Sequence, residues 1–535
     1  MNTPTRDTIE LDPDEDAPLL DLFDDDLEPA PPTPVHQRHH RQHGFARRFQ
    51  VQNRRRAIVL LAAIMFGFTA SGMLFLMPVA RLIEDAICHI HYDKPTSEPI
   101  DESQCKTEAV QRELAFLGGV SSALNGVVGL VATLPYGILA DRSIGRKPSF
   151  LLAYVGIFLA FSWGPLMLVV GERPHVRLAT LGSLFFLIGG GVPITMNTLN
   201  AMASDMSTES DRSSSFLFLA VGGASGGLLG PLAAGLLMEH LGPWFPVLLV
   251  LGISPFVFGS IVFLPETLPS KPTEFSAQDR PHRFIHQLRE QIHELKSSLS
   301  LLRNRNILLT MPAFLIQPVL FAAYSSTLVQ HMSTYFGWTM AQTTYLLSPL
   351  GVLQLTVMVL LPVVSSRITN LAPFARDLRL ERLSLLLMLA GAVIEALAGG
   401  RAFVLFLIGL TVGTVGGAVQ GPLCRAVATA HVSPSTTSRF FALISLLETA
   451  GGAIFGGPAL AWCFSEGVLR GKGTWWTGLP WVYVAVLVLG AMGAMAMVRP
   501  PPPQHVPGDE DEAEETMLGQ GNGVRLDSDD SILSR

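Results

Sequence analysis

The chain contains 535 residues, of which 49% are apolar and only 15% are charged, whereas about a quarter of the residues in soluble domains are charged. This composition excludes an ordinary soluble protein and predicts a polytopic membrane protein. The formal net charge of −7 comes largely from the two tails. It therefore gives no indication of a nucleic-acid partner, and we expect none.

Apolar segments recur along most of the chain. A helix needs about 20 apolar residues to cross the hydrocarbon layer of a bilayer. By this criterion the sequence predicts twelve membrane-spanning helices, at residues 57–80, 116–140, 148–171, 178–201, 215–237, 243–264, 307–328, 339–364, 383–398, 403–424, 440–463 and 481–498. The tail that precedes them has no early apolar core. We therefore expect no cleavable signal peptide and a first helix that stays in the membrane.

The positions of Lys and Arg predict the orientation of these helices, because basic residues concentrate in cytoplasmic loops. They gather before the first span, after the second, between the sixth and seventh, and after the eighth. The intervening loops at residues 238–242 and 330–338 contain neither Lys nor Arg. All the basic loops lie on one side if both termini are cytoplasmic.

The spans divide the chain into five segments. Residues 1–56 and 500–535 are tails too poor in apolar side chains to fold, and we expect both to be disordered. Residues 57–268 and 306–499 are each expected to form a six-helix bundle. Residues 269–305 form a cytoplasmic loop whose apolar residues recur at helical spacing, which predicts an amphipathic helix on the inner membrane surface.

The N-terminal tail contains a candidate sorting signal. Glu15, Leu19 and Leu20 have the spacing of an acidic dileucine motif. A chance occurrence in an acidic tail is an equal alternative. The expected location is therefore the plasma membrane or the vacuolar membrane.

The turn between the second and third predicted spans carries the most specific motif. Residues 137–148 read Gly-Ile-Leu-Ala-Asp-Arg-Ser-Ile-Gly-Arg-Lys-Pro. They resemble the loop signature of the major facilitator superfamily, G-x-L-A-D-R-x-G-R-K, with two residues in the place of one at Ser143 and Ile144. The resemblance implies a charged gate that closes the cytoplasmic face, formed by Gly137, Asp141, Arg142, Gly145, Arg146 and Lys147. The alternative is a basic loop that serves only topology.

A second signature lies in the fifth predicted span. Gly226, Gly230, Pro231 and Gly235 match most of the pattern G-x-x-x-G-P-x-x-G-G of the superfamily's antiporters, with Ala234 in place of one glycine. Small residues let helices approach closely, and a proline bends a helix. The resemblance implies a tight contact that seals the pathway against proton leak. Ordinary helix packing is the alternative.

Over residues 56–499 the chain resembles fungal members of this superfamily that are similar to drug–proton antiporters, tetracycline exporters and proton-coupled folate transporters. The resemblance implies an all-α membrane protein of the major facilitator fold, with 12 transmembrane helices in two six-helix bundles. Drug–proton antiporters also carry an arginine in the fourth span. Residues 185–191 are uncharged, so proton relay through such an arginine is not expected.

Few ionisable groups fall within the predicted spans, where a charge at the helix centre costs about 2.5–3.5 kcal/mol. Glu448, Glu395 and Asp205 are the candidate proton carriers, and Glu448 is the first choice. A neutral, hydrogen-bonded acid is an equal alternative for Glu448. Glu395 is better explained as an acid at the membrane interface that reaches water, and Asp205 as a gate or loop contact.

Uncharged polar residues in the spans predict a substrate cavity, since several share a helix face at a spacing of three, four or seven residues. The candidates are Asn125, Asn197, Asn200, Gln317, Tyr324, Gln354 and Gln420. Hydrogen bonding between helices is the alternative interpretation.

The four cysteines fall into two groups. Cys88 and Cys105 lie in the first outward loop, where a disulfide can form. Two free thiols are an equal alternative. Cys424 and Cys463 lie near the ends of apolar spans and are expected to be packing residues.

The function predicted is secondary active transport of small organic molecules by alternating access between the two bundles. No phosphate-binding G-x-x-x-x-G-K-[ST] loop and no catalytic constellation occurs in the sequence, so we expect neither an ATP-driven pump nor an enzyme, and no cofactor or metal. Efflux of a drug-like compound or secondary metabolite, coupled to protons, is the first hypothesis. Proton-coupled uptake of a nutrient or vitamin, or a non-transporting receptor, are the alternatives. We expect a monomer in a lipid bilayer.

Replacement of Leu19 and Leu20 by Ala is expected to move a fluorescent fusion of the full chain from the vacuolar to the plasma membrane, because the dileucine motif would no longer be recognised. Microscopy of living cells measures the shift. An unchanged distribution would remove the sorting hypothesis.

Overall fold

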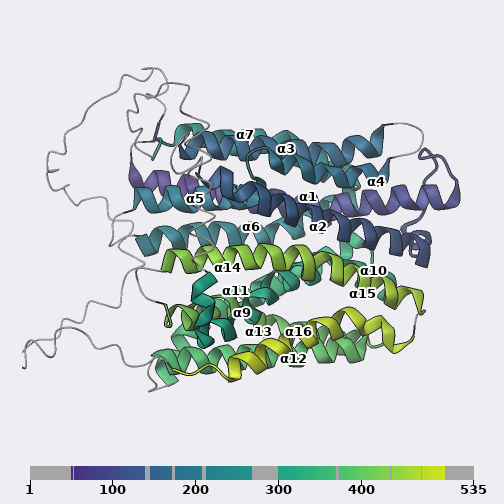
Figure 1. The fold of residues 1–535 in the computed structure, drawn as a ribbon. Helices are drawn as coiled ribbons and strands as arrows, with labels where there is room; N and C mark the ends of the chain where they lie inside the picture. The colour runs from purple at the N-terminus through teal and green to yellow at the C-terminus, as the bar shows by residue number, and fades with distance from the viewer. Residues whose placement is uncertain are drawn as a thin grey trace, which may run out of the picture. The chain divides into compact units, whose positions relative to one another are not determined.

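The computed structural model describes residues 50–51, 53–138, 145–170, 175–207, 212–267, 299–368, 373–432, 437–471 and 473–500. Within these ranges the chain is almost entirely helical and contains no strand. Figure 1 shows the long helices lying side by side. The dileucine motif, most of both tails and most of the predicted amphipathic helix lie outside the described residues. The last three residues of the predicted N-terminal tail, 54–56, belong to the first helix, so the expected disorder is wrong there.

The N-terminal half comprises α1 (Arg54–Tyr92), η4 (Glu102–Cys105), α2 (Glu108–Ile138), α3 (Arg146–Val169), α4 (Val176–Ala179), η6 (Thr180–Leu187), α5 (Gly191–Met206), α6 (Arg212–Leu241), α7 (Trp244–Gly259) and η7 (Ser260–Phe263). The C-terminal half comprises η9 (Leu299–Arg303), α9 (Arg305–Ala322), η10 (Ala323–Thr327), α10 (Leu328–Phe336), α11 (Met340–Ile368), α12 (Pro373–Ala398), α13 (Phe403–Thr429), α14 (Thr437–Gly451), η12 (Gly452–Gly456), α15 (Gly457–Leu469), η13 (Trp475–Gly478) and α16 (Leu479–Ala496).

Eleven helical segments in the described ranges are long and apolar enough to cross a membrane. Hydrocarbon offers no water to backbone N–H and C=O groups, and a helix satisfies these groups within one segment. The long helix α12 supplies a twelfth segment, although its first turns contain Arg376, Asp377 and Arg379. Each predicted span thus falls on a helix, and the predicted all-α fold is confirmed.

Large apolar side chains lie on the outer surfaces of these helices. Phe256 is 80% exposed, Leu397 is 71% exposed and Val404 is 69% exposed. A soluble protein rarely exposes so much apolar surface. These side chains therefore suit contact with lipid.

Helix α1 continues well past the predicted end of the first span at residue 80. Arg81 pairs with Glu84 at 3.4 Å and with Asp85 at 3.7 Å. Pairs three and four residues apart lie on one helix face and stabilise it. The helix ends only where Asp93 adopts a left-handed conformation with φ of 54°.

The fourth span is interrupted between η6 and α5, where a continuous helix over residues 178–201 was expected. Gly189 and Gly190 both have φ of 81°, and Gly191 has φ of 60°. Only glycine adopts such angles at little cost. The three glycines therefore change the direction of the backbone, in addition to allowing close packing by their lack of a side chain.

The glycines of the fifth-span signature bring α6 against two other helices. A Cβ atom at Gly226 would lie 2.9 Å from the backbone nitrogen of Ala70 in α1, and Gly230 also faces α1. A Cβ atom at Gly235 would lie 2.9 Å from the backbone oxygen of Ala341 in α11. The signature thus joins α6 to α1 and to the C-terminal half.

Gly226→Ala is expected to destabilise the protein by about 1–3 kcal/mol, since overpacking at a tight contact forces the two backbones apart. Thermal unfolding of the detergent-purified chain measures the effect. Gly227→Ala is the matched control, because its Cβ atom would meet only the Thr69 methyl group at 4.0 Å. Equal losses at both positions would contradict the assigned packing.

Candidate functional site

On the side expected to be cytoplasmic, a carboxylate caps the N-terminus of α3. The Arg146 and Lys147 backbone N–H groups donate to the two oxygens of Glu266, at 2.9 and 3.1 Å. Gly145 precedes them with φ of 99°, and a Cβ atom there would lie 3.1 Å from the Glu266 carboxyl carbon. A negative group at a helix N-terminus is stabilised by unpaired N–H groups and by the helix dipole. This glycine is therefore required by both backbone conformation and space.

The basic side chains of this segment bind neighbouring elements. Arg146 pairs with Asp205 at 3.4 Å, and Asp205 also accepts a hydrogen bond from Thr267 at 3.1 Å. Lys147 donates to the backbone oxygens of Val262 and Leu264 at 3.0 and 2.6 Å. These contacts tie α3 to α5 and to the chain that follows η7. They agree with the interpretation of Asp205 as a gate or loop contact.

The structure describes only some residues in the first part of the predicted gate. Gly137 belongs to the last turn of α2, whereas Asp141 and Arg142 lie outside the described residues. The role of the complete turn as a gate therefore stays a prediction.

A polar network lies inside the C-terminal half, and we call it the central network. Gln317 of α9 donates to the amide oxygen of Gln420 in α13. The Gln420 amide nitrogen donates to the Ala313 backbone oxygen at 3.1 Å and to Glu381 of α12 at 3.3 Å. Gln420 and Glu381 are fully buried. Three helices are thus joined by buried polar groups.

An ion pair continues the central network. Arg425 of α13 donates to Glu448 of α14 at 2.6 Å. Their side chains remain 40% and 25% exposed, respectively. A Cβ atom at Gly421 would lie 3.3 Å from the Arg425 guanidinium and 3.4 Å from the Gln317 amide nitrogen. The ion pair therefore adjoins Gln317, and Glu448 is not an isolated carboxyl group.

Two members of the central network were absent from the predicted site. Glu381 lies two residues before the predicted span 383–398, and Arg425 lies one residue after the span 403–424. The predicted spans therefore leave both residues just outside. The helices continue through them.

The other predicted cavity residues do not join this network. Asn125, Asn197 and Gln354 are exposed and form no side-chain hydrogen bond within the described part of the chain. Asn200 donates to the Met196 backbone oxygen of its own helix at 2.9 Å. Tyr324 stacks on Trp481, with 6.1 Å between the ring centroids. Of the seven candidates, the structure brings only Gln317 and Gln420 together.

The favoured interpretation of Glu395 is wrong. Its side chain is fully buried in α12, so it does not reach water at the membrane interface. The helix extends beyond this residue to Ala398 and places it below the outer end, against α13.

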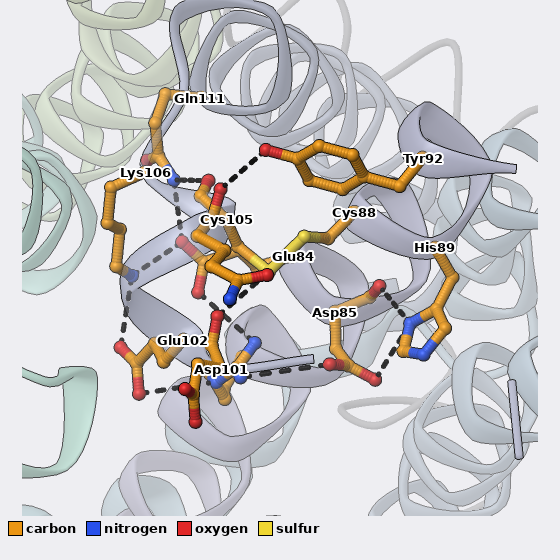
Figure 2. The surroundings of a disulfide bond; sticks show 12 residues. Glu84, Asp85, Cys88, His89, Tyr92, Asp101, Glu102, Cys105, Lys106 and Gln111 are labelled. Atoms are coloured by element: carbon orange, nitrogen blue, oxygen red, sulfur yellow. Dashed lines mark hydrogen bonds and ion pairs between the residues drawn. A yellow bond between two sulfur atoms is a disulfide. The ribbon is translucent and has the colours of Figure 1, made fainter. Parts of the chain in front are cut away.

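At the opposite end from the α3 cap, a disulfide joins Cys88 of α1 to Cys105 of η4. Beside it lies a set of charged and polar side chains that we call the outer cluster, comprising Arg81, Glu84, Glu102, Lys106 and Gln111. Figure 2 labels all of them except Arg81. Buried Glu84 accepts hydrogen bonds from Lys106 and Gln111, both at 2.6 Å. Lys106 also pairs with Glu102 at 3.0 Å, and Arg81 pairs with Glu102 at 3.3 Å. The disulfide and these pairs hold the loop against α1.

The outer cluster also contacts the C-terminal half. Glu102 accepts a hydrogen bond from the Met340 backbone N–H at the start of α11, at 2.9 Å. Thr334 of α10 donates to the amide oxygen of Gln111 at 3.2 Å. The loop between α1 and α2 thereby links the outer ends of the two halves.

Known proteins place this architecture in a family. The model of the Major Facilitator Superfamily matches residues 110–456. The MFS efflux pump atnC of Emericella nidulans is 30% identical over 80% of this chain and 85% of its own length. The efflux pump ustT of Aspergillus flavus is 26% identical over 83% of this chain and 88% of its own. Among solved structures, the nucleoside transporter NupG is similar with a TM-score of 0.58 at 13% identity, over 84% of this chain and all of that one.

The family match, the fungal relatives and the helical fold agree with one another. The chain therefore belongs to the Major Facilitator Superfamily and is a multi-pass membrane transporter.

Proposed function

We propose that this transporter exports a small organic molecule of the secondary-metabolite class from the cytoplasm in exchange for protons. The observation that carries the proposal is the half-exposed ion pair of Arg425 and Glu448 beside Gln317, inside the C-terminal half. The fungal relatives that are named efflux pumps support the direction. The chain would act as a monomer in the plasma or vacuolar membrane, with residues 57–268 and 306–499 as the two moving bundles.

The chemistry of the ion pair suits exchange of a substrate for a proton. Arg425 binds one oxygen of Glu448, and an ionised carboxylate has further acceptor sites for a hydroxyl or amino group of a substrate. A proton that binds Glu448 removes the negative charge and weakens both contacts. Substrate and proton would then compete for one carboxylate, as antiport requires.

The central network provides the remaining polar contacts. The Gln317 amide lies next to the ion pair, and Gln420 holds it in place through their hydrogen bond. Glu381 in turn holds Gln420 from α12. Such support fixes the orientation of the groups that would meet a substrate.

Glu448→Gln is expected to reduce export by roughly tenfold or more, because a hydrogen bond to a charged group contributes about 1.5–3 kcal/mol. The measurement is the intracellular accumulation of a panel of hydroxylated and amino-bearing fungal metabolites in cells that lack other exporters. Membrane yield is followed with a fluorescent tag.

Glu466→Gln is the matched control for Glu448→Gln. Glu466 also pairs with an arginine, Arg470, at 3.7 Å, but this pair lies at the far end of α15. We expect it to leave export unchanged. Normal export by Glu448→Gln would contradict the role of the ion pair, and higher accumulation in the presence of the wild-type chain would indicate uptake.

Export also requires the outer ends of the halves to separate, which breaks the Glu102–Met340 and Gln111–Thr334 contacts. Ala115 offers a reporter position, because it is 2% exposed and packs with Phe464 of the C-terminal half. In an Ala115→Cys chain, Glu102→Ala is expected to raise labelling by an impermeant maleimide from outside roughly tenfold. The physical reason is the loss of a charged hydrogen bond, about 1.5 kcal/mol.

The control for this measurement is Glu98→Ala in the same loop. Glu98 pairs only with Lys94, at 2.6 Å, among the described ion pairs. The Glu98→Ala substitution also removes one negative charge from the loop, but it alters no described ion pair with the C-terminal half. Equal labelling of both variants would show that Glu102 does not hold the outer ends together.

A further inference from the structure

Several buried polar atoms without a hydrogen-bond partner gather in the outer part of the C-terminal half. They are both carboxyl oxygens of Glu395, Nδ1 of His331, the hydroxyl group of Tyr335 and Nε1 of Trp481. We call these four residues the Glu395 cluster. Such atoms are rare in folded proteins, and each calls for a functional explanation or an unseen proton or water.

Ring contacts connect the members of the cluster. The His331 ring lies 4.8 Å from the Tyr335 ring and 5.8 Å from the Trp481 ring. Trp481 stacks in turn on Tyr324. The Tyr324 hydroxyl and a Glu395 oxygen face the same glycine of α13, at 3.1 and 3.7 Å from where its Cβ atom would be. A series of neighbouring rings therefore leads from His331 of α10 to Tyr324, whose hydroxyl group lies near the Glu395 carboxyl group.

The fold makes room for the carboxyl group of Glu395. A Cβ atom at Gly409 would lie 2.9 Å from the Glu395 side chain, and Gly413 leaves similar space one turn later. The two glycines let α13 approach α12 at this point. The carboxyl group therefore occupies a prepared position between helices.

The surroundings of Glu395 contain no compensating charge within the described residues. Beside Glu395 lie Tyr324 of η10 and the two glycines of α13. Trp481 of α16 stacks on Tyr324, and His331 and Tyr335 of α10 lie beyond Trp481. No described Lys, Arg or His forms an ion pair with it. A buried carboxylate without any hydrogen-bond donor is strongly unfavourable. This carboxyl group therefore holds a proton while the outer ends of the two halves are in contact, which we call the closed state.

His331 is in the tautomer that leaves one ring nitrogen free to accept a proton. Its Nε2 lies 3.1 Å from the Gly399 backbone oxygen. A carbonyl group only accepts, so Nε2 carries the hydrogen. Nδ1 then has a free lone pair and no partner. His331 is also three residues from Thr334, whose hydroxyl group donates to Gln111 and so helps to join the outer ends of the two halves.

We propose that Glu395 is a proton-binding site separate from the central network, and that His331 delivers protons to it from the outer face when the halves separate there. The proposal rests on the proposed proton exchange. When the outer ends separate, water enters past Thr334, and a hydronium ion from it gives a proton to His331 Nδ1 and becomes water. Glu395 can accept this proton only after it has released its previous one to water on the inner side, while that side is open. The imidazolium ion then passes its Nδ1 proton through water to the Glu395 carboxylate, which becomes a neutral carboxylic acid again, and the histidine returns to its neutral form.

Infrared spectroscopy of the full chain in phosphatidylcholine vesicles tests the proposal without a transported compound. At neutral pH the wild-type protein is expected to show a protonated-carboxyl C=O band that Glu395→Gln removes and the control Glu466→Gln retains. Buried Glu381, which also pairs with no described cation, contributes a separate band that remains in Glu395→Gln. After transfer to D2O, His331→Gln is expected to slow the isotopic shift of the Glu395 band at least tenfold. Glutamine can still donate to Gly399 but cannot relay a proton. Glu102→Ala is expected to accelerate the shift.

Persistence of the whole band in Glu395→Gln would overturn the proton site. Equal exchange rates in His331→Gln and wild type would overturn the route, and His331→Phe provides a second variant if the first does not fold. Because neither readout needs a substrate, loss of the export proposal and loss of this one can be told apart. A normal band and route with no detectable export would refute only the former.

Discussion

Hydrocarbon cannot solvate a charge, and this constraint decides where the ionisable side chains of the transporter lie. Each buried charge must meet an opposite charge or be neutralised by a proton. Arg425 and Glu448 satisfy the rule by pairing. Glu395 meets no cation among the described residues, and we propose that it satisfies the rule with a proton. The same rule makes both arrangements responsive to proton binding, because a proton changes which partner each group needs.

The two halves place their charges differently. In the N-terminal half the described charged groups lie towards the ends of the helices, where the Glu266 cap holds α3 and the outer cluster holds the first loop. In the C-terminal half, Glu381 and Glu395 lie within α12, where both are fully buried. In our proposal the first half mainly supplies closure, and the second half supplies the proton-binding and substrate-binding groups. Polar closing contacts suit this division, because water replaces them at modest cost when the ends separate.

Much of the fold could be predicted from the sequence, since the length and spacing of apolar segments are set by the bilayer. The glycine signature of α6 could also be predicted, because close approach requires small residues. The central network could not, because the predicted spans 383–398 and 403–424 leave Glu381 and Arg425 just outside. The Glu102–Met340 contact joins residues 238 positions apart, and no local pattern reveals it. Burial of Glu395 likewise depends on how α12 packs against α13.

The central claim is that two membrane-embedded glutamates adopt opposite charge states, and solid-state NMR of the carboxyl carbons tests it most directly. Glutamate labelled with 13C at the carboxyl carbon would be incorporated into the full chain in vesicles at neutral pH. Signals are assigned by their loss in Glu448→Gln and Glu395→Gln. We predict an ionised carboxylate signal for Glu448 and a protonated carboxyl signal for Glu395. An ionised Glu395 or a protonated Glu448 in the closed state would contradict the account.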